Sequence, residues 1–141
     1  MGDLLVHPHR GVGPVFFGMT REEVRSTLAA SHREFSRGLR EEMDTDAFDE
    51  LGVFVSYGVD GTCEAIEVVA PSNAIMNGMR LVGTSFSIVL GRFREWDSAL
   101  SIDDAGATSI DLGVGVYAPS AGKDPGKPVE SAIVFRSGYY D

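Results

Sequence analysis

The sequence predicts an α+β protein in which two tandem helix–β-hairpin repeats form one largely antiparallel sheet, with the helices packed on one face. Three pairs of short matches support this prediction, because they follow in the same order at offsets of 65, 61 and 67 residues. They pair residues 13–20 with 78–85, 51–55 with 112–116, and 65–66 with 132–133. We interpret residues 1–141 as a single domain with an internal repeat, 13–69 and 78–135. The alternative is that two helix–hairpin units converged on the same turn chemistry.

A capping box marks the start of the first helix. Thr20 precedes the predicted helix, and Glu23 stands three positions later, so each can bind the backbone amide of the other. Met19 and Val24 occupy the flanking hydrophobic-staple positions. Acidic residues in the first turn also favour the positive end of the helix dipole. We therefore expect a helix from Thr20 to about Ala30.

The second helix begins with a weaker capping signal. Ser85 takes the cap position, but Ile88 replaces the glutamate of the first copy. Apolar residues then recur at helical spacing. They are Phe86, Val89, Leu90 and Phe93. We expect this helix to be the more buried of the two.

Each helix is followed by a predicted hairpin. The first pairs residues 52–58 with 63–70 around Asp60-Gly61, a dipeptide that tolerates positive φ in tight turns. The second pairs 109–118 with 129–137, joined by the longer segment 119–128. Loops often carry function, so its Lys123 and Lys127 are candidate partner-binding residues. A tolerated insertion at a hairpin tip is the alternative.

Charge and cysteine content exclude several classes of function. The formal net charge of −9 disfavours nucleic acids and anionic membranes as partners. No basic, apolar N-terminal segment indicates a signal peptide. Cys63 is the only cysteine, so no intrachain disulfide can form, and we expect it to pack in a strand rather than react. These features predict a cytoplasmic protein.

The segment 41–50 carries six acidic residues in ten positions. Two interpretations remain open: a recognition patch for a basic protein, or a solvated loop. The recognition hypothesis assigns partner binding to Asp44, Asp46, Asp49 and Glu50. A calcium loop is set aside because its glycine and its final glutamate are missing.

Enzyme signatures are weak throughout the chain. There is no nucleophile elbow, phosphate loop or zinc-protease motif. His7 and His9 could face one side of a strand and bind a metal, but no third ligand is evident and an exposed polar stretch is the better explanation. We therefore assign no catalytic residue, no metal ligand and no cofactor from the sequence.

The opening Gly11-x-Gly13-Pro14-Val15-x-Phe17-Gly18-Met19-Thr20-x-x-Glu23-Val24 resembles that of small uncharacterised bacterial proteins, especially from high-GC Gram-positive (actinobacterial) species. Its second half is similar to a helix start in the outer-membrane-assembly lipoprotein E group. The tandem unit also resembles the duplicated β-lactamase inhibitor proteins, in which a sheet face grips another protein. These groups are exported and the inhibitors carry disulfides, so the resemblance implies the fold and no functional residue.

These observations favour a non-catalytic protein-binding module, of inhibitor or immunity type, whose acidic surface meets a basic protein. The alternative from another class is a small-ligand-binding protein or hydrolase with a pocket between sheet and helices. A third hypothesis is an assembly module that forms a homo-oligomer through an exposed sheet edge.

Overall fold

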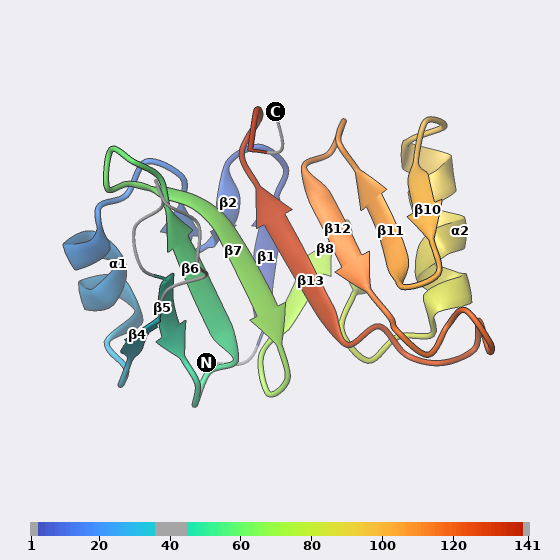
Figure 1. The fold of residues 1–141 in the computed structure, drawn as a ribbon, viewed down its shortest axis with the longest axis horizontal. Helices are drawn as coiled ribbons and strands as arrows, with labels where there is room; N and C mark the ends of the chain where they lie inside the picture. The colour runs from blue at the N-terminus through green and yellow to red at the C-terminus, as the bar shows by residue number, and fades with distance from the viewer. Residues whose placement is uncertain (1–2, 36–44, 140–141) are drawn as a thin grey trace.

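The computed structural model describes residues 3–35 and 45–139, which form two β-sheets and two α-helices (Figure 1). The larger sheet has the strand order β10-β11-β12-β13-β7-β6-β5-β4, and all its neighbouring strands are antiparallel. These strands are β4 (Arg33–Phe35), β5 (Thr45–Phe48), β6 (Val53–Tyr57), β7 (Cys63–Val69), β10 (Ser101–Asp103), β11 (Gly106–Ser109), β12 (Val114–Tyr117) and β13 (Ser131–Phe135).

The smaller sheet has the order β3-β2-β1-β8-β9, with the parallel pair β1–β8 at its centre. Its strands are β1 (Asp3–His7), β2 (Gly11–Gly13), β3 (Val15–Phe16), β8 (Asn73–Met76) and β9 (Met79–Arg80). The helices are α1 (Arg21–Leu28) and α2 (Phe86–Trp96). Neither has the length and apolar character that a membrane-spanning helix needs, and this holds for every helix in the described residues.

The α+β class is confirmed, whereas the prediction of one sheet is wrong. The strands that precede each helix form the second sheet, in which Leu5 of β1 lies opposite Ile75 of β8. These strands have two to five residues each. Such short runs carry too little periodicity to reveal their pairing in the sequence.

Both predicted hairpins are present, as β6 with β7 and β12 with β13. Gly61 has a φ of +80° in the first turn, as the Asp-Gly signal predicts. The predicted strand 109–118 begins later, at Val114. The chain turns at Gly113, whose φ is +71°. The residues that precede this turn form an additional strand, β11.

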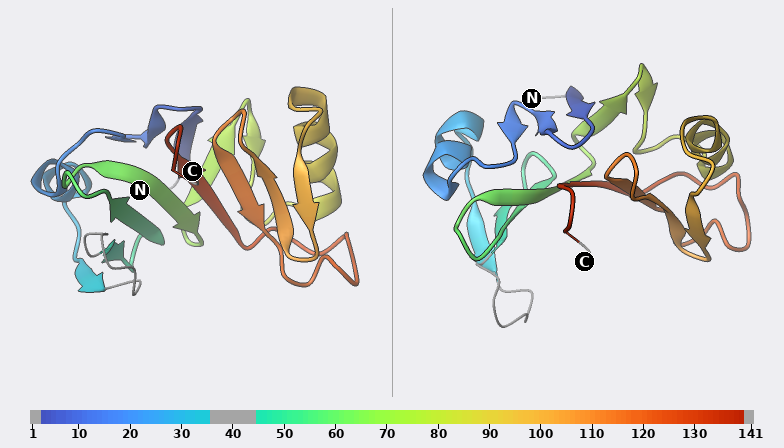
Figure 2. Two further views of the ribbon diagram at one scale, coloured as in Figure 1. Left: turned by 45° about the horizontal axis from the view of Figure 1, so that its top comes forward. Right: turned by 90° about the horizontal axis from the view of Figure 1, so that it is seen from above.

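Both helices and the smaller sheet lie on the same face of the larger sheet (Figures 1 and 2). The hydrophobic core fills the space between these layers, and it includes the buried side chains of Val6, Ile66 and Phe93. In the view from above in Figure 2, the two ends of the larger sheet bend away from the helices. The uncovered face of this sheet is therefore concave.

The two helices begin in different ways. The predicted capping box is present at α1, where Thr20 and Glu23 each bind the other's backbone amide. The prediction that Ser85 caps α2 is wrong, because its side chain makes no capping hydrogen bond. Instead, the carbonyls of Lys127 and Pro125 accept hydrogen bonds from the first two amides of α2, both at 2.9 Å. The long segment 119–128 thus supplies the cap that the second helix lacks in its own sequence.

The element order is the same in the two parts of the larger sheet. One part runs α1-β4-β5-β6-β7 and the other runs α2-β10-β11-β12-β13, and they meet at the antiparallel pair β7–β13. Phe54 pairs with Glu67 in the first part, and Gly115 pairs with Ile133 in the second. By this register, Glu67 corresponds to Ile133. The match of residues 65–66 with 132–133 is therefore off by one position, which would exchange core and surface faces.

Candidate functional site

The uncovered face of the larger sheet carries one continuous row of paired side chains. Side chains alternate along a strand, so the residues that do not enter the core point to this face. The row consists of Phe54, Glu67, Ile133, Gly115 and Thr108, which are in register across β6, β7, β13, β12 and β11. Neither of the two described helices covers this row (Figure 2).

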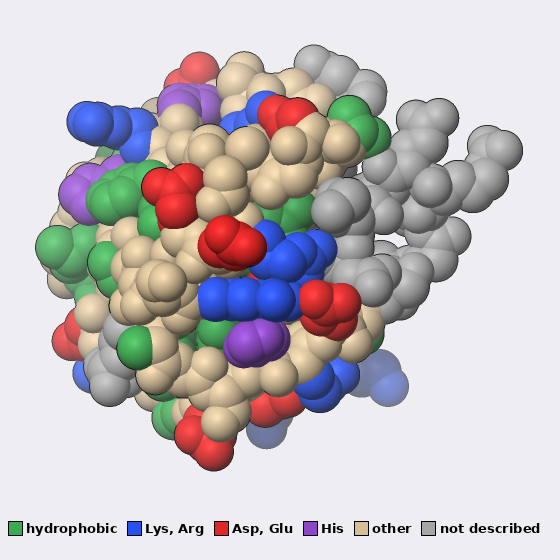
Figure 3. Space-filling model, turned by 90° about the vertical axis from the view of Figure 1, so that its left-hand side faces the viewer, with side chains coloured by type: hydrophobic (Ala, Val, Ile, Leu, Met, Phe, Trp, Pro, Cys, Tyr) green, Lys and Arg blue, Asp and Glu red, His purple; other side chains and the backbone are tan. Residues whose placement is uncertain are grey.

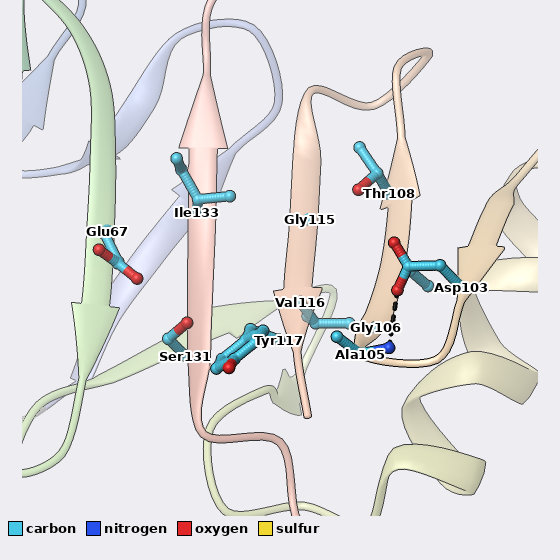
Figure 4. Close-up of a pocket in the computed structure, with 11 residues that line it drawn as sticks. Glu67, Asp103, Ala105, Gly106, Thr108, Gly115, Val116, Tyr117, Ser131 and Ile133 are labelled. Atoms are coloured by element: carbon cyan, nitrogen blue, oxygen red, sulfur yellow. Dashed lines mark hydrogen bonds between the residues drawn. The ribbon is translucent and has the colours of Figure 1, made fainter. Parts of the chain in front are cut away.

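A hollow of about 390 Å³ lies in the β10–β12 half of this face (Figure 4). Two glycines, Gly106 and Gly115, leave its floor without side chains. A Cβ at Gly115 would lie 3.3 Å from both Ile133 Cγ2 and Thr108 Oγ1. A Cβ at Gly106 would lie 2.0 Å from the carbonyl oxygen of Val116, so only glycine fits there.

The ionisable side chains that line the hollow are acidic or phenolic. Glu67 of β7 and Asp103 of β10 lie on opposite sides of it (Figure 4). Four strand spacings separate β7 from β10, which corresponds to about 19 Å across the sheet. Asp103 Oδ1 accepts a hydrogen bond of 2.8 Å from the Ala105 amide. Tyr117 is 50% exposed, so its ring is accessible from this side.

The lining contains no histidine, cysteine, lysine or arginine among the described residues. The hollow therefore has no histidine to act as general base and no cysteine or lysine to act as nucleophile. The arrangement suits recognition: apolar and hydroxyl side chains lie around a glycine floor, with a carboxylate on each side.

We call α1 and β4–β7 the first half of the molecule, and α2 and β10–β13 the second half. In the first half, the position that corresponds to Gly115 is filled by an aromatic ring. Phe54 stands where β12 has Gly115, and its ring packs edge-on against Phe35 with centroids 6.4 Å apart. The signal for the hollow is therefore present in the sequence, in the one mismatch between residues 51–55 and 112–116. Sequence reasoning did not find the hollow, because the residues that the two segments share define the match and this one difference carries no signal by itself.

The structure places Asp46, a predicted partner-binding residue, in the interior, and this corrects its assignment to an exposed patch. Arg25 donates to both of its carboxylate oxygens at 2.8 and 2.9 Å, and Arg21 donates at 2.6 Å. The Tyr57 hydroxyl donates to it at 2.9 Å. Strand β5 turns this side chain inward, toward α1, because its neighbour Ala47 takes the opposite face.

These contacts determine the protonation state of the cluster. Burial alone would raise the pKa of Asp46, but hydrogen bonds from Arg25 and Tyr57 and the charge of Arg21 hold it below its usual value. Burial and the nearby Asp46 charge raise the pKa of the Tyr57 hydroxyl. Arg25 also reaches Glu34 at 2.5 Å, so acidic and basic side chains alternate on this end of the molecule (Figure 3). The cluster is internally neutralised.

The remaining predicted residues lie apart from one another. Asp49 is exposed and accepts hydrogen bonds from Arg33, which lowers the pKa of its carboxyl. Glu50 is exposed beside it, and Asp44 lies outside the described residues. Lys123 and Lys127 are exposed on the loop that caps α2, where they line a separate hollow of about 590 Å³. That loop and β5 lie at opposite ends of the larger sheet (Figure 1).

Cys63 and His7, two residues with side chains capable of chemistry, lie away from the hollow. Burial raises the pKa of Cys63 to about 12, so its thiol stays protonated near neutral pH and is a poor nucleophile. His7 packs against the ring of Phe16, with centroids 5.8 Å apart. Within the described parts of the chain, no group of three or more His, Cys, Asp or Glu is arranged to hold a metal ion.

Comparison of this chain with protein-family models, curated proteins and solved structures gave no significant match.

Proposed function

We propose that the protein is a non-catalytic binding module that holds a basic partner protein on the concave face of its larger sheet, as an inhibitor or immunity-type protein would. The observation that carries this proposal is the hollow around Gly115, which opens to solvent and has Glu67 and Asp103 on its two sides. A concave acidic face complements a convex basic surface and speeds encounter with it. The net charge of −9 acts in the same direction at longer range.

The proposal also includes an internal duplication. The identical order of elements around the β7–β13 pair supports it. In this reading, the first copy kept an aromatic side chain on the uncovered face at Phe54, and the second copy lost it at Gly115. The two halves have thereby become specialised, one for packing and one for binding.

Affinity capture with two matched variants tests the proposed face. Ile133→Arg places a cation beside the hollow, whereas Ile88→Arg makes the same substitution on α2, where Ile88 is 58% exposed. We expect wild type and Ile88→Arg to retain the same basic protein from a lysate of the source organism. Ile133→Arg should lose it through like-charge repulsion.

The result that contradicts the proposal is equally specific. A protein retained by all three baits would bind elsewhere, and no retained protein at all would argue against a binding module. Circular dichroism of the two variants must first show that both keep the wild-type fold.

A second candidate function is the binding of a small molecule in the same hollow. Its volume of about 390 Å³ falls in the range of small-molecule pockets, roughly 300–1,000 Å³. The residues that line the hollow belong to strands β7 and β10–β13 and to the turn between β10 and β11, and both helices lie on the other face of this sheet (Figure 2). The hollow is therefore not between sheet and helices, as the sequence suggested. Native mass spectrometry of protein purified from its source distinguishes the candidates, because a bound metabolite adds a defined mass.

A further inference from the structure

We infer that the hollow around Gly115 receives an arginine side chain of the partner protein. This inference rests on the proposed function and adds the chemistry of the contact. It starts from the first half of the molecule, where the corresponding surface position is occupied by a planar group belonging to the chain itself.

In the first half, two aromatic rings occupy the positions that matter. Phe54 lies on the uncovered face, and Phe35 of the edge strand meets its ring edge-on. In the second half, Gly115 replaces the first ring, and the strand register places Asp103 where Phe35 stands. The second half therefore lacks a planar group at the position of Phe54, and it has the carboxylate of Asp103 at the position of Phe35.

An occupant must therefore combine a flat surface with hydrogen-bond donors for a carboxylate. Arginine meets both conditions, because its planar guanidinium stacks on aromatic faces and presents several N–H groups. Tyr117 offers a half-exposed ring at the hollow, and Asp103 offers a carboxylate with no ion-pair partner among the described residues. The aliphatic part of the side chain would lie over Gly115 beside Ile133.

The electrostatics of the lining select for a cation. The charged residues at the hollow are Glu67 and Asp103, both acidic. A phenylalanine from a partner would fill the volume but would supply no positive charge to the Asp103 carboxylate. A lysine would neutralise charge but has no planar group to stack on Tyr117.

Nuclear magnetic resonance provides a direct test, because Gly106 and Gly115 supply backbone amide signals at the floor of the hollow. The ¹⁵N-labelled protein is titrated with three capped tripeptides, Gly-Arg-Gly, Gly-citrulline-Gly and Gly-Phe-Gly. Citrulline keeps the shape of arginine and loses its charge. We expect the arginine peptide to shift both glycine signals, with an affinity about tenfold higher than that of the citrulline peptide.

Two variants connect the signal to the hollow. Asp103→Asn should reduce the affinity for the arginine peptide about tenfold. Asp111→Asn removes the same charge at an exposed position outside the lining and should leave the affinity nearly unchanged. Gly115→Phe, which copies Phe54, should abolish the shift of the remaining reporter, the Gly106 signal, and Asp103→Asn provides the test should that variant fail to fold.

Three outcomes would overturn the inference. The glycine signals could stay unmoved by the arginine peptide, the citrulline peptide could bind equally well, or the phenylalanine peptide could bind at least as tightly as arginine. Each of these results leaves the capture experiment with Ile133→Arg intact, because that experiment asks whether any protein uses this face.

Discussion

At the start of α1, the Thr20 hydroxyl accepts a 3.2 Å hydrogen bond from the Glu23 amide, and the Glu23 carboxylate accepts a 3.0 Å bond from the Thr20 amide. Thr20→Ala should lower the free energy of unfolding by about 1 kcal/mol, because one helix amide loses its acceptor. Ser85→Ala should have a smaller effect, since backbone carbonyls cap α2. Urea unfolding of both variants measures the difference. Equal losses would contradict the structure.

The carboxylate of Asp46 should give the stability of the fold a specific dependence on pH. Its pKa in the folded state lies below the value of about 3.9 for an unfolded aspartate. The stabilisation is therefore complete well above this unfolded value and is lost as the pH falls through the folded-state pKa. We expect urea midpoints of the wild type to fall below about pH 4 more steeply than those of Asp46→Asn. Identical slopes would mean that Asp46 titrates normally.

At the level of elements, α1 and α2 pack on the larger sheet with opposite chemistry. Arg21 and Arg25 of α1 meet Asp46 of β5. The corresponding residues of the second half are apolar. They are Phe86 and Leu90 of α2 and Ala107 of β11, all members of the hydrophobic core or packed against it. The fold therefore accepts either an ion cluster or an apolar contact at this position.

This comparison predicts the effect of exchanging one chemistry for the other. Asp46→Ala alone should destabilise by about 3 kcal/mol or more, because Arg21 and Arg25 lose the carboxylate between them. The combination Arg21→Phe, Arg25→Leu, Asp46→Ala and Tyr57→Phe copies the apolar contact and removes the unpaired hydroxyl. It should return within about 1 kcal/mol of wild type or exceed it. Denaturant midpoints test both variants, and a combination weaker than the single change would refute the equivalence of the helices.

The elements with local signals were predictable from the sequence. The capping box of Thr20 and Glu23 predicted the start of α1, and the turn residue Gly61 predicted the first hairpin. The second sheet was not predictable, because β1 and β8 pair across about 70 residues of chain and neither is long enough to show a pattern. The cap of α2 was also not predictable, because its acceptors, such as the Lys127 carbonyl, lie far along the chain from the helix.

Reasoning from charge alone did not reveal that one of the predicted partner-binding residues, Asp46, is buried. Six acidic residues among the ten positions 41–50 suggested a surface patch, but strand alternation turned Asp46 inward to meet two arginines. Composition cannot show this, because the partners lie more than 20 positions earlier in α1. The hollow exists because Gly115 has no side chain. The sequence alone does not show this, because Gly115 can be compared with Phe54 only once the strand register is known.

On the scale of the whole molecule, the two halves are joined twice. The pair β7–β13 connects them in the larger sheet, with Ile66 opposite Val134 in the core. The pair β1–β8 connects the segments ahead of the two helices in the smaller sheet. Neither half can lose its strands without exposing core side chains of the other. We therefore expect residues 3–35 and 45–139 to unfold as one cooperative unit.

Trp96, the only tryptophan, provides a probe confined to the second half, where it packs against Phe93 with ring centroids 5.8 Å apart. Asp46→Ala perturbs only the first half, at the contact between α1 and β5. If the halves unfold together, this change should lower the Trp96 fluorescence midpoint in urea by the same amount as the far-ultraviolet circular dichroism midpoint. The two probes should also coincide in the wild type. A Trp96 transition that stays in place while the circular dichroism curve splits into two steps would show instead that each half is a separate folding unit.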